Sequence, residues 1–256
     1  MSSHIECERE GSVALVFIRR PERKNALTAA MYAALATLIA RLDDDPEVRV
    51  LLIAGTDDCF TAGNDLTDFV THPPTGPDSP VFRFLATLAA CRKPVVAAVN
   101  GVAVGVGTTL LLHCELIYAA EDARFQMPFV NLGLCPEAAS SLLLPRLVGY
   151  PRAAEWLLLG EPFDAEQAFE AGLINAVLPR ERVLITALER AQTLAERPAA
   201  AVRLTKALLK QRDAAAVQAA LVEEGREFVA RLGSPEAREA FAAFAEKRKP
   251  DFSRFA

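Results

Sequence analysis

The sequence is poor in aromatic residues and has no long apolar run. Only 7% of its 256 residues are aromatic, and no apolar stretch reaches the roughly 18 residues that a membrane-spanning helix requires. The net charge is −5, and the basic clusters at 19–20 and 247–249 are short. We therefore expect neither a membrane nor a nucleic acid as a partner, although such clusters can contact a small phosphorylated ligand.

Histidine and cysteine are also scarce, which bears on metal binding and on cellular location. The three histidines and five cysteines show no CxxC pair and no spacing typical of metal ligands, so no metal is expected. The odd number of cysteines, and an N-terminal stretch too polar and acidic for a secretory signal, indicate reduced thiols and a cytoplasmic location.

The composition that remains is globular, with 52% hydrophobic and 24% charged residues. Short apolar runs typical of buried strands alternate with segments of helical pattern, which predicts an α/β fold with right-handed crossovers. The strands are expected at 12–20, 48–55 and 94–101, and a further strand with a turn at 115–127. A helix is expected from its N-cap Thr28 to about Leu42.

The second half of the chain changes in character. In the first half, residues 72–80 are rich in proline and predict a surface loop. Asp164 and Gln167 have the spacing of a capping box, and Gly172 fits the end of that helix. After 173–179 the strands cease. Further helices are expected over 183–247, with breaks near Pro198 and 233–235.

Two glycine-containing turns follow buried strands and are candidates for ligand binding. They are "CFTAGNDL" (59–66) and "NGVAVGVGTTLLLHCE" (100–115), where Gly105 and Gly107 precede an apolar helical run. Two backbone N–H groups that converge from such turns would form an oxyanion hole. On pattern alone, two ordinary strand-to-loop connections remain an alternative, since short glycine motifs are common. Neither turn has the G-x-G-x-x-G order of a dinucleotide site or the lysine of a P-loop.

Glu137 is a lone carboxylate in the otherwise apolar stretch "NLGLCPEAASSLLLP". It is either an exposed carboxylate in the first turn of a helix that begins near Pro136, or a buried group needed for chemistry. Apolar neighbours would raise its pKa and a helix N-terminus would lower it, and the sequence leaves that balance open. Nearby, Cys135 is expected to be a small buried hydrophobe and His113 a core residue.

Several blocks of the chain together resemble the crotonase (enoyl-CoA hydratase/isomerase) superfamily. These blocks are "RPERKNALT", "FTAGNDLTDF", "KPVVAAVNGVAVGVGTTLLLHCELIYAAEDARFQMPFVNLGLCPEAASS", "AFEAGLINAV" and "FAEKRKPDF". The resemblance implies a crotonase-like spiral of ββα units, with a core over 1–195 and a helical C-terminal trimerisation region over 196–256. It also implies a homotrimer or a dimer of trimers. The substrate would be an acyl-CoA, with coenzyme A as its carrier and no separate cofactor.

The resemblance also assigns catalytic roles. It implies oxyanion-hole N–H groups at Ala62 and Val106, where the commoner pattern has glycine at the second position. The two water-activating glutamates of the hydratases fall on Thr109 and Phe129, which cannot act as carboxylate bases. The chain is most similar to the peroxisomal-type Δ3,Δ2-enoyl-CoA isomerases, and on that match Glu137 is the catalytic base.

Other residues are implied to contact substrate. They are Gly63, Asn64, Asp65 and Leu66 in the first turn, Phe129 in the acyl region, and Lys24 and Lys249 near the CoA phosphates and adenine. Asp65 is expected to cap the next helix, and the Asn64 side chain to bond backbone rather than substrate. The two lysines are alternatively solvated surface residues.

The predicted activity is therefore Δ3,Δ2-enoyl-CoA isomerisation by a proton shuttle from C2 to C4, in fatty-acid β-oxidation. Two alternatives remain. One is another crotonase reaction, such as weak hydration or thioester hydrolysis. The other is a CoA-thioester binding protein without efficient turnover.

Overall fold

The computed structural model describes residues 4–255 and contains two β-sheets. The larger sheet has the strand order β1-β2-β3-β5-β7-β10 and is parallel except for the β1–β2 pair. Its strands are β1 (Ile5–Glu10), β2 (Val13–Ile18), β3 (Val50–Ala54), β5 (Val95–Val99), β7 (Leu116–Ala120) and β10 (Ala176–Leu178). Every residue of β2, β3 and β5 is buried, as their continuous apolar runs predict.

The smaller sheet has the order β4-β6-β8-β9. Its strands are β4 (Cys59–Thr61), β6 (Val102–Val104), β8 (Arg124–Gln126) and β9 (Phe163–Asp164). Along the chain, β3 is followed by β4, β5 by β6 and β7 by β8, so each turn of the chain adds one strand to each sheet. This is the predicted spiral of ββα units. The segment 115–127, expected as a strand and a turn, contains a second strand after the turn, so that β7 and β8 lie in different sheets. Strand β1 was not predicted.

Helices surround the sheets. Those before β10 are α1 (Ala29–Asp44), α2 (Leu66–Thr71), α3 (Pro80–Ala90), α4 (Val106–Thr109), α5 (Ser140–Val148), α6 (Tyr150–Leu159) and α7 (Ala165–Glu170), with 3₁₀ turns at Pro21–Arg23, Leu110–His113 and Val130–Leu132. Thr28 caps α1 by accepting a hydrogen bond from the Met31 N–H, and Asp164 and Gln167 form the predicted capping box of α7. The apolar run after the second glycine turn is a short α4 and a 3₁₀ turn rather than one helix.

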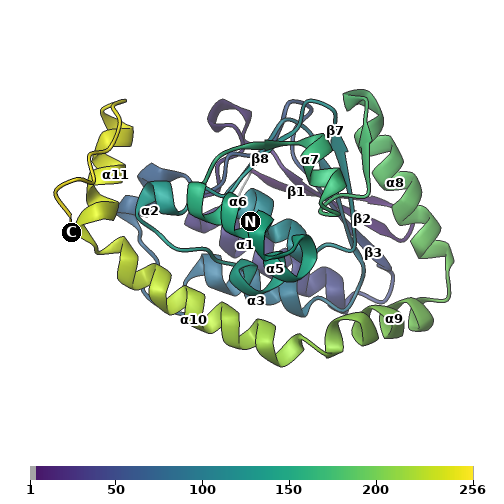
Figure 1. Ribbon diagram of the computed structural model, residues 1–256. Coiled ribbons are helices and arrows are strands. Elements are labelled where there is room, and N and C mark those ends of the chain that lie inside the picture. Colours follow the sequence, from purple (N-terminus) through teal and green to yellow (C-terminus); the bar gives the residue numbers. More distant parts are fainter. Residues whose placement is uncertain (1–3, 256) are drawn as a thin grey trace.

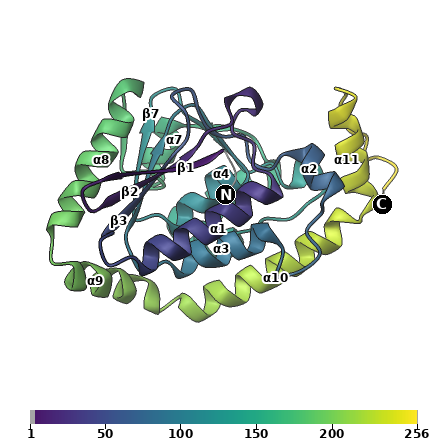
Figure 2. The same cartoon turned by 180° about the vertical axis from the view of Figure 1, so that it is seen from behind.

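The C-terminal region consists of α8 (Arg180–Glu196), α9 (Ala199–Gln211), α10 (Ala214–Leu232) and α11 (Pro235–Ala245). The predicted breaks at Pro198 and 233–235 are confirmed, while the break between α9 and α10 was not foreseen. Helix α8 packs on the larger sheet. Helix α9 follows α8, α10 then runs along α3 and α5, and α11 ends beside α2 (Figures 1 and 2). The division into two units at residue 195 stays a prediction.

No helix within residues 4–255 combines the length and apolar character needed to cross a membrane. All five cysteines are free thiols. Burial raises the pKa of Cys135 to about 11, so this thiol stays protonated near neutral pH. The Cys135 side chain is partly buried and packs against the hydrophobic core.

Candidate active site

The two glycine turns lie against each other, which brings their predicted functions to one place. A Cβ atom on Gly63 would lie 2.6 Å from the Val104 carbonyl oxygen, and one on Gly107 would lie 2.7 Å from the Thr61 side chain. Only glycine allows these close approaches. A cavity of about 460 Å³ opens beside them and is lined by Gly63, Asn64, Gly105 and Phe129, among other residues.

In the first turn, the free backbone N–H group belongs to Asn64 rather than to Ala62. The Ala62 N–H donates to the Lys24 carbonyl oxygen at 2.9 Å. The N–H groups of Gly63 and Asp65 also donate within the protein. The Asn64 N–H has no acceptor among the described residues. This corrects the sequence-based choice of Ala62, whose N–H is already engaged.

In the second turn, Val106 is the first residue of α4 and follows Gly105, which has a φ of +57°. The first N–H groups of a helix have no acceptor within the helix, and the Val106 N–H has no other acceptor within residues 4–255. Its predicted availability as a donor therefore agrees with the structure. The Val106 side chain is buried, so valine in place of glycine fits this turn.

Glu137 is buried, with 4% of its surface exposed, and it precedes α5 rather than lying in it. The prediction of a helix that begins near Pro136 is wrong, because Ala138 and Ala139 adopt left-handed conformations that delay the helix to Ser140. The Glu137 Oε1 accepts a hydrogen bond from the Thr109 hydroxyl. Its Oε2 is buried and has no partner among the described side chains and backbone.

Burial raises the pKa of Glu137 to about 8. The Thr109 hydrogen bond acts in the opposite direction, and the negative charge of Glu224 adds to the rise. The balance that the sequence left open is thus decided by desolvation, since Glu137 is not in a helical turn. A carboxylate with this pKa is a much stronger base than an exposed glutamate, and part of it is ionised near neutral pH.

The two positions where a hydratase would carry glutamates hold no carboxylate. Thr109 is fully buried and contacts Glu137. Phe129 is buried and lines the cavity, and its ring meets that of Phe228 from α10 edge-on, with centroids 6.5 Å apart. Neither position therefore offers a carboxylate that could hold or activate water.

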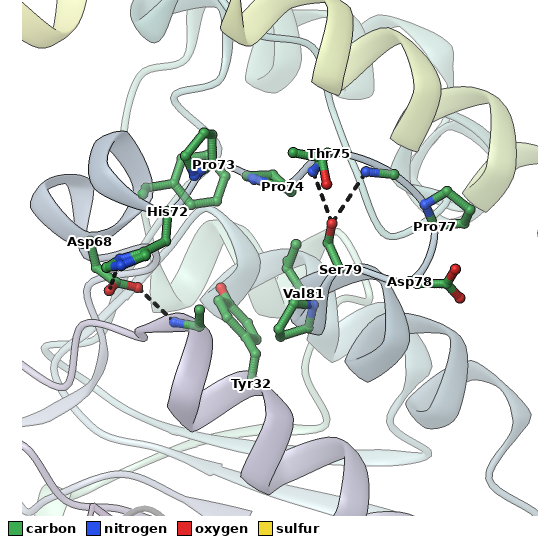
Figure 3. A pocket seen from close by; sticks show the side chains of 14 residues that line it. Tyr32, Asp68, His72, Pro73, Pro74, Thr75, Pro77, Asp78, Ser79 and Val81 are labelled. Atoms are coloured by element: carbon green, nitrogen blue, oxygen red, sulfur yellow. Dashed lines mark hydrogen bonds and ion pairs between the residues drawn. The ribbon is translucent and has the colours of Figure 1, made fainter.

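Tyr32 is a site residue that the sequence analysis missed. Its hydroxyl donates to the Asn64 Oδ1 at 2.5 Å, so the Asn64 side chain bonds a phenol and not the expected backbone. The ring projects from α1 into a second cavity of about 520 Å³ beneath the proline-rich loop (Figure 3). In the sequence, Tyr32 is one of several residues on the apolar face of this helix, and that pattern does not predict its contact with Asn64.

The remaining predicted residues divide between the cavity and other roles. Asp65 caps α2 and pairs with Arg20 at 2.7 Å, which confirms a structural role, although it also lines the cavity. Leu66 and Lys24 line the same cavity. Lys249 is exposed and is absent from the cavity wall.

The loop predicted at 72–80 is present as residues 72–79 between α2 and α3, and Pro80 is the first residue of α3. The Ser79 hydroxyl accepts hydrogen bonds from the N–H groups of Thr75 and Gly76, which fixes the loop over Tyr32 (Figure 3). No group of three or more histidine, cysteine or acidic side chains suited to a metal ion occurs in the described part of the chain.

A family model described as enoyl-CoA hydratase/isomerase matches residues 8–254. The structure is similar to that of OdaA from Pseudomonas aeruginosa, with a TM-score of 0.93 and 48% identity over 95% of this chain and 99% of the other. The sequence is 37% identical to 1,2-epoxyphenylacetyl-CoA isomerase of Escherichia coli (strain K12), over 98% of this chain and 97% of that protein. It is 34% identical to enoyl-CoA delta isomerase 2 of Rattus norvegicus, over 95% of this chain and 63% of that protein. Further relatives are named as hydratases and as a dehalogenase.

Proposed function

Because the chain belongs to the enoyl-CoA hydratase/isomerase family, the crotonase superfamily of enzymes that act on acyl-CoA thioesters, we propose that it is a Δ3,Δ2-enoyl-CoA isomerase. The observation that carries this proposal is one buried carboxylate, Glu137, whose Oε2 is free. A hydratase would need two carboxylates to hold and activate water, and Thr109 and Phe129 occupy both of those positions.

Two backbone donors support binding of the thioester. The substrate carbonyl oxygen would face the free N–H groups of Asn64 and Val106, one from each of the two glycine turns. Each such donor stabilises a developing oxyanion by on the order of 3 kcal/mol. We propose Asn64 in place of Ala62 because, from Ala62 to Asp65, only the Asn64 N–H has no acceptor among the described residues.

Glu137 would then carry one proton between two carbons. The ionised Oε2 removes a proton from C2 of a 3-enoyl-CoA. The electron pair of that C–H bond forms a C1–C2 double bond as the electrons of the carbonyl double bond move onto the thioester oxygen, giving a dienolate that keeps the C3–C4 double bond. The protonated carboxyl then returns the same proton to C4. As the carbonyl re-forms, the C1–C2 pair becomes the C2–C3 double bond and the C3–C4 pair forms the new C4–H bond, so the 2-enoyl product is conjugated with the thioester. A positioned general base of this kind contributes roughly 10²–10⁴-fold.

The names of the relatives support both the class of substrate and the type of reaction. Hydratase, isomerase and dehalogenase names among them all describe reactions of CoA thioesters. Two of the proteins compared above are isomerases, and one is named for moving an enoyl double bond. Lys24 at the cavity edge is proposed to contact the CoA phosphates, whereas the role of Lys249 stays a prediction.

The direct test is Glu137→Gln assayed on a 3-enoyl-CoA, where formation of the conjugated thioester raises ultraviolet absorbance. Activity is expected to fall at least 10³-fold, while Glu121→Gln, a change at an exposed glutamate, leaves it unaltered. Activity of Glu137→Gln within a few-fold of the parent would show that another group is the base. A fall in the absorbance of a 2-enoyl-CoA would indicate hydration instead, and binding without either change would indicate a non-catalytic protein.

We further propose a homotrimer or a dimer of trimers, and a cytoplasmic role in fatty-acid β-oxidation. Large apolar side chains on α9 and α10 support an assembly, since they are exposed in the single chain: Leu204, Leu208, Leu209 and Val222. Light scattering on the purified protein measures the number of subunits, and a monomer would contradict this proposal.

A further inference from the structure

Two alanines in left-handed conformations connect Glu137 to α5. Ala138 has a φ of +63° and Ala139 a φ of +56°. Residues with a Cβ atom adopt this conformation at a cost, and such strain persists only where the surroundings hold it. The direction of the Glu137 side chain therefore depends on contacts that fix this turn.

One set of contacts comes from Glu224 on α10, 85 residues from Ala139 in the chain. Its carboxylate accepts hydrogen bonds from the Ala139 N–H at 2.6 Å, from the Ser141 N–H at 2.9 Å and from the Ser141 hydroxyl. Glu224 is buried, with 8% of its surface exposed. A carboxylate in this position satisfies N–H groups at the start of α5 that have no acceptor within the helix.

A second contact holds the other side of the turn. The Nε2 atom of His113 lies 2.8 Å from the Ala138 carbonyl oxygen, and His113 is 3% exposed. A carbonyl oxygen only accepts, so Nε2 carries the hydrogen. Burial lowers the pKa of His113 to about 4, which keeps the ring neutral and in this donating form near neutral pH.

We propose that Glu224 and His113 are positioning residues that hold the Ala138–Ala139 turn, so that Glu137 meets Thr109 through one oxygen and substrate through the other. This inference rests on the proposed role of Glu137 as the base. Like Glu137 itself, neither residue is among those that line the cavity beside the glycine turns. The same helix α10 carries Phe228, one turn beyond Glu224, in the cavity wall. The placement of α10 thus sets both the base and the surface against which the acyl chain packs.

A purely structural role for Glu224, as a cap of α5, predicts a loss of stability alone. A positioning role predicts a fall in the rate of proton transfer with little change in substrate affinity. These two roles are distinguished by measuring, with NMR, how fast the C2 protons of butyryl-CoA exchange with D₂O. A saturated thioester has no double bond to move, so exchange reports on Glu137 even if isomerisation is absent.

The variant Glu224→Gln keeps the size of the side chain but turns one acceptor oxygen into a donor facing N–H and O–H groups. We expect its exchange rate to fall at least tenfold, with the affinity for butyryl-CoA within twofold of the parent. Adding Ala139→Gly is expected to recover much of the loss, because glycine adopts the left-handed conformation without strain. Glu223→Gln, a change at the preceding and exposed residue, is the matched control.

An exchange rate of Glu224→Gln within twofold of the parent overturns the proposal. A crystal structure of the same variant gives a test that needs no activity. Loss of the hydrogen bond between Thr109 and Glu137 is expected, and its retention with an unchanged turn contradicts the inference. Should Glu224→Gln not fold, Ser141→Ala removes one donor to Glu224 and is expected to lower exchange about three- to fivefold, with no change overturning the proposal.

Discussion

The Thr109 hydroxyl donates a hydrogen bond to the Oε1 of Glu137, and both side chains are buried. The other carboxylate oxygen has no partner among the described residues. A hydroxyl that holds one oxygen fixes the plane of the carboxylate and leaves the second oxygen for proton transfer. Thr109 therefore does more than replace a hydratase glutamate. Its hydroxyl determines which carboxylate oxygen of Glu137 remains available for proton transfer.

Replacing Thr109 by valine is expected to raise the pKa of Glu137 further, since the hydrogen bond stabilises the ionised form. A loss of about 1 kcal/mol of hydrogen bonding corresponds to a shift of roughly 0.7 pKa units. The acid side of the kcat/KM profile should move to higher pH, and activity at pH 7 should fall about fivefold. Thr109→Ser keeps the hydroxyl and should keep the parent profile. Identical profiles for the valine and parent proteins would contradict a role for this hydrogen bond.

The parent protein itself should show a marked dependence on pH. Glu137 acts in its ionised form and has a pKa of about 8, so kcat/KM should rise with pH through that region and level off above it. Below the inflection each pH unit should cost about tenfold. The measurement is the initial rate on a 3-enoyl-CoA at low concentration between pH 6 and 9.5. A rate that does not change over this range would mean that the base is a group with an ordinary carboxylate pKa.

The fold was predictable because its main signals are local. Apolar runs long enough for a strand marked β2, β3, β5 and β7, and Thr28 and Asp164 marked helix starts. Strand β1 was missed since four of its six residues are exposed and three are glutamates, a pattern that favours no buried strand. Strands of three residues, such as β8, are too short to show the alternation of apolar and polar residues that marks a strand.

The site was predictable in its residues but not in its hydrogen bonds. Whether the N–H of Ala62 or of Asn64 is free depends on pairing with the Lys24 and Leu27 carbonyl oxygens, which lie almost 40 residues earlier in the chain. No local pattern reports such pairing. The delayed start of α5 has the same origin, because Glu224 from α10 holds the turn before it.

Introducing a carboxylate at the first hydratase position should not create a hydratase. In Thr109→Glu the new side chain would lie beside Glu137 without a second polar group at Phe129, and two adjacent buried carboxylates resist joint ionisation. We expect no hydration of a 2-enoyl-CoA, seen as unchanged ultraviolet absorbance, and a large loss of isomerase activity. The double variant Thr109→Glu/Phe129→Glu is the comparison. Measurable hydration by the single variant would count against the two-carboxylate requirement.

The buried carboxylate should also make the protein less stable as the pH rises. Below about pH 4.5, the ordinary glutamate pKa, Glu137 is protonated in both the folded and the unfolded chain. Between that value and about 8, the unfolded chain releases the proton while the folded chain retains it, so the free energy of unfolding falls. Above about 8 the loss is complete, and it amounts to at most about 5 kcal/mol.

Glu137→Gln removes this dependence and should therefore stabilise the protein while abolishing its activity. The gain over the parent should be small at pH 5 and largest at pH 8.5, measured as the difference in free energy of unfolding from urea titrations. Glutamine can still accept the Thr109 hydrogen bond, so the comparison isolates the charge. Glu121→Gln, at an exposed position, should show no such trend. An equal gain at both pH values would mean that Glu137 titrates as an ordinary carboxylate, and that burial does not supply its basicity.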